Sequence, residues 1–360
     1  MLQRLVQRTT TPSKTPGGRS GIPRLAAGIL ERIEGIDEGD GIVSETCALI
    51  RIQRLRVENA NAVSGSLTWG FPPPSAFLGF AHALERRLDS VKLGGVGIVC
   101  HAFDPQVAFS RGPWQPGRFR LARFPYIAGW KKFQDKPSSI VEEGRAHLEV
   151  TLLIEVLTEL DEDRLDALGR RIQSVLPTLR LAGGSPRHWR TVDFLEWPEW
   201  EEDQREAFRK LRYRLLPGFA LVKREDLLNR HLQHLKQDNP DITPLDAFLD
   251  LLALHVDPVE DNGKVQWQRR SRPGWLVPLP TGYAGLSPLH APGEVANARD
   301  PETPFRFAEA LYTIGQWLSP HRLTHLEQML WHTETDQDNG LYLCQNRYSQ
   351  FSKETHDDED

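Results

Sequence analysis

The chain of 360 residues is poor in the features that mark several common protein classes. It has three cysteines, Cys47, Cys100 and Cys344, and no CxxC pair. This spacing predicts a reducing, cytoplasmic location and no zinc site. No apolar run approaches the roughly 20 residues that cross a bilayer, so we expect no membrane contact. The basic first 24 residues lack the long apolar centre of a secretory signal.

Common catalytic signatures are missing as well. The sequence has no phosphate-binding P-loop, HExxH metalloprotease helix, serine-hydrolase elbow or Cys/His cluster. Nucleotide hydrolysis, zinc proteolysis and serine esterase chemistry therefore lack support, and we expect no metal and no cofactor. The formal net charge is -5, from 44 basic and 49 acidic residues. A nucleic-acid site must then come from local clustering of charge rather than from the whole surface.

Hydrophobic periodicity indicates an α+β protein. Residues 48–57 (ALIRIQRLRV) alternate apolar with basic side chains, as in a strand with one buried and one positively charged face. A flexible polar loop is expected over residues 59–66, and three prolines then start a helix. The predicted order is strand 48–58, helix 73–89, strand 95–103, insertion 104–139, strand 146–158, helix 161–176 and a strand near 190–197. This βαββαβ order is that of an RRM-like or ferredoxin-like fold.

The second half of the chain predicts a mixed α/β lobe over residues 198–354. Its expected elements are a strand at 218–222 and helices at 199–216, 224–236, 244–255, 304–318 and 321–332. We therefore divide the chain into an N-terminal extension (1–47), an RRM-like domain (48–197), this lobe and an acidic tail (355–360).

The insertion has the composition of a clamp for single-stranded RNA. Between Arg111 and Lys136, seven cations alternate with aromatic rings and only one acid, Asp135, interrupts them. Cations bind phosphates, and each base stacked on an aromatic ring contributes about 1–3 kcal/mol. The alternative is a solvated loop whose aromatic side chains pack beneath it.

Several short sequence motifs, taken in order along the chain, resemble those of one known family. Examples are GVGIVCHAF (95–103), LRLAGGS (179–185), RPGWLVPLPTGY (272–283) and PGEVANARDPETPFRF (292–307). The chain resembles the Cas-five-type subunit of type I-F CRISPR surveillance complexes, the second Csy family within the RAMP superfamily. The resemblance spans most of residues 48–345.

The resemblance implies an RRM-like palm, with the insertion as a thumb. It implies a non-catalytic subunit that holds the 5′ handle of the guide RNA. The implied partners are the large Csy subunit, as a heterodimer, the backbone Csy subunits, and target DNA through the assembled complex. The glycine-rich loop of such proteins is expected to approach a phosphate. The candidate RNA-binding residues are Arg54, Arg56, Asn59, Asn61, Ser64, Trp69, Arg118, Arg120, Arg123, Lys131, Lys132, Arg145, Arg180, Gly183, Gly184, Ser185, Arg190, Arg272 and Arg299.

Two other functions remain open at this stage. Some RAMP relatives cleave RNA, and His101 or His147 is the candidate general acid or base for such an endoribonuclease. A purely structural adaptor, whose basic loops face acidic protein partners, is the second alternative.

Overall fold

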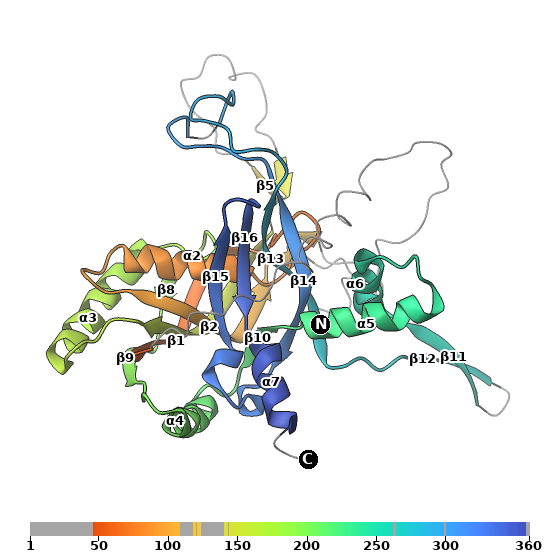
Figure 1. The fold of residues 1–360 in the computed structure, drawn as a ribbon, viewed down its shortest axis with the longest axis horizontal. Helices are drawn as coiled ribbons and strands as arrows, with labels where there is room; N and C mark the ends of the chain where they lie inside the picture. The colour runs from red at the N-terminus through yellow and green to blue at the C-terminus, as the bar shows by residue number, and fades with distance from the viewer. Residues whose placement is uncertain are drawn as a thin grey trace.

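The computed structural model describes residues 46–108, 118–119, 121–123, 140–142, 144–261, 264–298 and 300–357 (Figure 1). Residues 1–45 of the predicted N-terminal extension lie outside these residues, as do Arg120, Lys131, Lys132 and Arg299. The backbone of Arg118 and Arg123 is described, in strands, but their side chains are not.

The first half of the chain follows the predicted element order. The main elements are β1 (Ala48–Asn61), α2 (Pro74–Glu85), β2 (Leu93–Pro105), β7 (Arg145–Val156), α3 (Glu162–Val175), β8 (Ser185–His188) and β9 (Thr191–Glu196). The insertion contributes two short antiparallel pairs, which are β3 (Val107–Ala108) with β4 (Arg118–Phe119), and β5 (Leu121–Arg123) with β6 (Ile140–Glu142). Pro74 occupies the first turn of α2, where its missing N–H costs no hydrogen bond.

β1 lies at the centre of the first half. It pairs antiparallel with β7 on one side and with β8 and β9 on the other, and β7 pairs antiparallel with β2. α2 and α3 pack on one face of these strands, where Phe77, Phe80 and Ile172 join Ile52 and Leu55 in a single core cluster. At one end the opposite face is covered by α4 (Glu201–Arg214), whose Phe208 shares a second core cluster with β1 and β7 side chains.

The second half extends the same sheet. Its elements after α4 are β10 (Phe219–Lys223), α5 (Glu225–Asp238), α6 (Pro244–Leu252), β11 (Val256–Asp261), β12 (Lys264–Arg269), β13 (Trp275–Gly285), β14 (Ala308–Leu318), β15 (Leu330–Asp336), β16 (Leu341–Asn346) and α7 (Tyr348–Asp357). β11 and β12 form a separate hairpin that projects from the sheet (Figure 1). The protein is therefore α+β with a largely antiparallel sheet, as predicted.

Two predicted helices in this half are wrong. The segment predicted as helix 304–318 contains β14, and the segment 321–332 contains a 3-10 turn at Leu326–Gln328 and the start of β15. Ala, Glu and Leu in these segments favour helix locally. However, residues 313–318 are buried without interruption between β10 and β13, and this tertiary pairing overrides the local preference.

β2 joins the two halves. Its edge opposite β7 pairs with both β15, at Leu330 and Gly97, and β10, at Ala220 and Val99. The strands β10, β14, β13, β16 and β15 thus return to β2 at both ends and form a closed circuit with it. Trp331 is fully buried within this arrangement and donates a hydrogen bond from Nε1 to the Leu221 carbonyl at 2.9 Å.

A buried acidic cluster lies under β15. Glu155 of β7 is fully buried and accepts hydrogen bonds from the Thr46 hydroxyl and the Gly95 amide. His332 lies between two carboxylates, with Nδ1 3.7 Å from Glu155 and Nε2 3.9 Å from Glu327. Burial raises the pKa of Glu327 to about 7, and the charge of Glu155 acts in the same direction. Burial also lowers the pKa of His332.

No helix in the described part of the chain has the length and apolar character needed to span a membrane.

Candidate nucleic-acid interface

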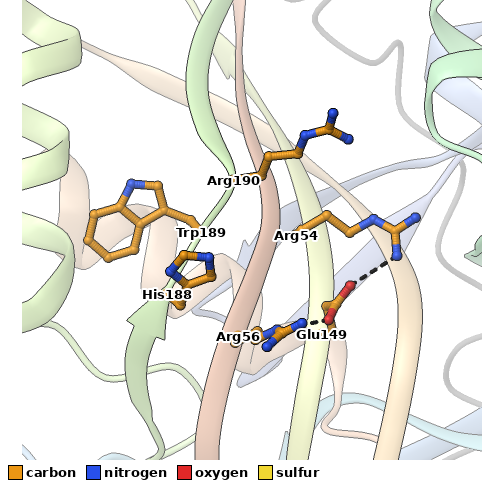
Figure 2. Close-up of a pocket in the computed structure, with 6 residues that line it drawn as sticks. All are labelled: Arg54, Arg56, Glu149, His188, Trp189 and Arg190. Atoms are coloured by element: carbon orange, nitrogen blue, oxygen red, sulfur yellow. Dashed lines mark hydrogen bonds and ion pairs between the residues drawn. The ribbon is translucent and has the colours of Figure 1, made fainter.

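A shallow pocket of about 380 Å³ opens on the sheet face opposite α2 and α3, beyond the end that α4 covers (Figure 2). Three strands and one turn supply its lining. β1 provides two arginines, β7 provides a carboxylate, the end of β8 provides a histidine, and the β8–β9 connection provides the rest. The lining residues are Arg54, Arg56, Glu149, His188, Trp189 and Arg190.

A β-bulge in β1 turns the basic residues toward this pocket. The pairing of β1 with β7 shifts between Ile52 and Leu55, and Arg54 has a φ of 50°. The extra residue lets Ile52 and Leu55 both reach the core beneath α2 and α3, while Arg54 and Arg56 lie on the other face. The amide of Arg54 donates to the Thr151 hydroxyl at 3.2 Å, which fixes the bulge against β7.

Glu149 organises the two arginines of β1. Its Oε1 accepts from Arg54 Nη1 at 2.9 Å and its Oε2 accepts from Arg56 Nε at 3.0 Å, as Figure 2 shows. Glu149 stands directly across the β1–β7 ladder from Arg56, so the pair follows from strand register. Partial burial alone would raise the pKa of Glu149, but hydrogen bonds from both guanidinium groups outweigh it and the pKa is lowered. The carboxylate is therefore ionised at neutral pH.

The β8–β9 connection completes the pocket. His188 stands across the β1–β8 ladder from Arg56, and the Arg190 amide donates to the Gln53 carbonyl at 2.8 Å. Trp189 is among the lining residues, but its indole packs against the core on the side of α2 and α3 and points away from Arg54 and Arg56 (Figure 2). Arg190 is exposed, and its guanidinium has no ion-pair partner among the described residues. The pocket thus combines cations with the exposed ring of His188, which suits a phosphodiester chain with a stacked base.

Two further predicted residues lie near the end of β1, namely Asn59 on β1 itself and Arg145 at the start of β7. Asn59 has a φ of 57° at a second register shift, and its Oδ1 accepts from Gln106 Nε2 at 2.6 Å. Arg145 donates from Nη1 to the Asn59 carbonyl at 3.4 Å. Both side chains therefore belong to a polar network that also includes His147.

The loop after β1 is held by several hydrogen bonds. Asn61 Oδ1 accepts from the Val63 amide at 3.0 Å, and the Ser64 and Thr68 hydroxyls lie 3.0 Å apart. The Tyr312 hydroxyl of β14 lies 3.2 Å from both the Ser66 hydroxyl and the Leu67 amide. Trp69 is half-buried in the same loop. The loop that the sequence predicts to be flexible is thus tied to β14.

The glycine-rich loop forms a tight turn against β1. Ala182 and Gly183 have successive φ values of 49° and 74°, and Leu181 and Gly184 exchange backbone hydrogen bonds, as in a two-residue hairpin turn. Gly184 is buried, and a Cβ there would stand 2.7 Å from the Ala60 amide nitrogen and the Glu58 carbonyl oxygen. Glycine at this position therefore allows the two backbones to pack closely. The Gly184 amide already donates a hydrogen bond to the Leu181 carbonyl. Gly183 is exposed, and Arg180 bonds the Ser185 hydroxyl across the turn.

Arg272 lies in a different place from Arg54 and Arg56. Its Nη2 donates to the Leu252 carbonyl at 3.0 Å and also bonds the Ala253 carbonyl, at the C-terminal end of α6. It lines a second pocket, between α5 and α6, rather than the pocket of Arg54 and Arg56. Capping of a helix accounts for this guanidinium without a ligand.

The two candidate catalytic histidines are both engaged. His101 Nδ1 lies 2.6 Å from the Pro217 carbonyl, which only accepts, so Nδ1 donates and Nε2 accepts from the Thr151 hydroxyl at 2.7 Å. Burial lowers the pKa of His101. His147 Nδ1 accepts from the Asn59 amide at 3.4 Å, and its Nε2 lies 3.2 Å from Gln106 Nε2.

The structure therefore brings Arg54, Arg56 and Arg190 together from the predicted set. Glu149, His188 and Trp189 of the pocket lining were not among the predicted site residues. Glu149 was detectable in principle, because an acid on a strand that pairs with a basic strand is a candidate cross-strand partner.

The protein has clear relatives. A family model described as CRISPR-associated protein (Cas_Csy2) matches residues 50–344. The chain is also 44% identical, over 318 residues, to a protein named CRISPR-associated protein Csy2 from Pseudomonas aeruginosa (strain UCBPP-PA14). That alignment covers 83% of this chain and 95% of the relative. The matched span agrees with the range that carries the resemblance, and the family assignment made from the sequence is confirmed.

Proposed function

Because the chain belongs to the Csy2 family of CRISPR-associated proteins, we propose that it is an RNA-binding assembly subunit of a type I-F Cascade (Csy) complex. It holds the 5′ handle of the guide RNA. The observation that carries this proposal is the pocket where Arg54, Arg56 and Arg190 come together on the sheet face opposite α2 and α3.

The strand order β9-β1-β7-β2, with α2 and α3 on one face, supports an RRM-like palm over residues 48–197. RRM domains bind single-stranded RNA on the sheet face that their helices leave open. The pocket lies on that face. Its central strands present guanidinium groups instead of aromatic rings, so RNA binding there depends on phosphates, with stacking at the edge on His188.

Hydrogen-bond geometry leaves the arginines competent for this role. Arg54 uses Nη1 for Glu149 and Arg56 uses Nε, so each guanidinium keeps further N–H donors for a phosphate oxygen. Arg190 adds a cation whose charge no described residue neutralises. Arg145 and Asn59 continue the polar surface along β1 toward the insertion, which is the proposed thumb.

The proposed partners follow from membership of the complex. The subunit pairs with the large Csy subunit as a heterodimer, contacts the backbone subunits through its thumb, and meets target DNA only in the assembled complex, where guide pairing reads the sequence. We propose no catalytic role. The two ring nitrogens of His101 are occupied by Pro217 and Thr151, which supports a structural role for this histidine over an acid–base one.

A three-residue substitution tests the proposal. Replacing Arg54, Arg56 and Arg190 with alanine in the assembled complex should weaken handle binding. It should also lower the slope of log affinity against log salt by about 2, at roughly 0.7 for each single-strand phosphate contact.

The matched control replaces three exposed arginines on helices elsewhere, Arg164, Arg205 and Arg209. It removes the same charge and should leave the slope unchanged. Equal slopes for both variants, with unchanged circular-dichroism spectra, would refute the proposed RNA site.

A further inference from the structure

We infer that Glu149 sets the selectivity of the RNA pocket by holding Arg54 and Arg56 in place while repelling phosphates that bring no other contact. The inference rests on the proposed RNA-binding function and deepens it. Glu149 is a positioning residue in this account, because it acts on RNA through the two arginines.

Glu149 is the one carboxylate among the described residues that line the pocket, against three arginines. It is mostly buried, with 19% of its side chain exposed, whereas the Arg56 side chain is 64% exposed. The carboxylate therefore sits at the base of the pocket, with guanidinium groups above it. A phosphate that enters meets two cations and, behind them, a negative charge that is only partly screened by water.

The contacts of Glu149 have two opposite effects on RNA. Each of its oxygens fixes one long side chain, at 2.9 Å for Arg54 and 3.0 Å for Arg56, so fewer rotamers are lost when a phosphate binds. At the same time, its charge offsets one of the two positive charges it holds. The first effect favours a ligand whose phosphate fits the fixed donors. The second disfavours every phosphate.

Only a ligand with additional contacts overcomes the repulsion. The pocket offers two, the Arg190 guanidinium and the exposed ring of His188. An RNA whose bend places one phosphate over Arg54 and Arg56, and a base against His188, uses all of them. An unrelated strand that follows the basic face uses the phosphate contacts alone, and so the carboxylate discriminates against it.

Glu149→Gln tests this inference because glutamine keeps the size of the side chain and removes its charge. The full chain is titrated with two probes, the 5′ repeat-derived segment of its own guide RNA and a scrambled RNA of equal length and composition. We expect the scrambled RNA to bind about fivefold tighter, on the scale of one or two exposed ion pairs. Affinity for the 5′ segment should change less, so that the ratio of the two affinities falls.

Glu58→Gln is the matched control. Glu58 lies on β1, the strand next to that of Glu149, and pairs with an arginine, Arg187, at 3.4 Å, but it is outside the pocket and its side chain is 52% exposed. This substitution removes the same charge from the neighbouring strand, and it should leave the affinity ratio unchanged.

The salt dependence separates selectivity from loss of structure. With the carboxylate removed, the freed guanidinium takes a further phosphate, and the slope for scrambled RNA should steepen by up to about 0.7. An unchanged affinity ratio in Glu149→Gln would overturn the inference, as would equal weakening for both probes with a shallower slope. If the Arg54, Arg56 and Arg190 triple variant also binds both probes like the wild type, the proposed RNA site itself fails.

Discussion

Replacing Glu327 with glutamine should stabilise the protein above pH 7 and leave its stability unchanged near pH 4.5. The Glu327 carboxyl is mostly buried, and its Oε2 lies 3.9 Å from His332 Nε2. Burial raises its pKa from 4.5 to about 7, the charge of Glu155 raises it further, and Arg347 opposes both. Glutamine keeps the shape of the side chain and does not ionise.

The magnitude follows from the pKa difference between the folded and unfolded chains. Below pH 4.5 the carboxyl is protonated in both states, so it contributes no pH dependence. As pH rises to about 7, the Glu327 carboxyl ionises first in the unfolded chain. Folding must then either protonate this carboxyl or bury its charge. At about 1.36 kcal/mol per pKa unit, the cost reaches about 3 kcal/mol. For a chain of 360 residues this corresponds to roughly 4 °C in melting temperature.

The measurement is the difference in unfolding free energy between Glu327→Gln and the wild type, from about pH 4.5 to about pH 8. The difference is needed because His332 has a lowered pKa, so its contribution is present above pH 6.5 and is lost as pH falls. Glu159→Gln, at an exposed position after β7, serves as the control. A difference that stays constant over this range, or a variant less stable than wild type above pH 7, would refute the reasoning.

Two other predictions concern backbone packing and the insertion. Gly184→Ala should lower stability by about 1–3 kcal/mol, because its Cβ would meet the β1 backbone at 2.7 Å. Gly79→Ala, in α2 with no atom within 4 Å of its Cβ position, should raise stability by about 0.5–1 kcal/mol in the same thermal melts. Equal effects would contradict the packing argument. Replacing Arg118, Arg120, Arg123, Lys131 and Lys132 in the assembled complex should lower the salt slope of RNA binding by about 3–4, and an unchanged slope would place these cations away from phosphates.

The first half of the fold was readable from sequence because its signals are local. The prolines before α2 and the run of β-branched and leucine residues in β7 each specify an element within a few residues of the chain. β14 and β15 gave no such signal. Their strand conformation depends on partners that lie far away in sequence, such as Gly97 of β2 for Leu330.

The site was only partly predictable for a related reason. The alternation of apolar and basic residues predicted that Arg54 and Arg56 lie on the basic face of β1, but it did not predict the bulge at residues 52–55. Two consecutive polar residues, Gln53 and Arg54, are the sequence trace of that bulge. Arg51 also belongs to the basic pattern, yet it is buried and pairs with Asp193 of β9. Which arginines remain open depends on how far α4 extends over the sheet, and sequence periodicity does not report this.

The closed circuit of strands on β2 has a consequence for the order in which the chain folds. During synthesis residues 48–197 emerge first, and the outer edge of β2 then has no partner until β10 and, more than a hundred residues later, β15 are made. An unpaired strand edge is a template for pairing with other chains. A fragment that ends at residue 197 should therefore aggregate, even though it contains every described residue of the proposed RNA pocket. We expect the half that carries this pocket to depend on the C-terminal strands for solubility.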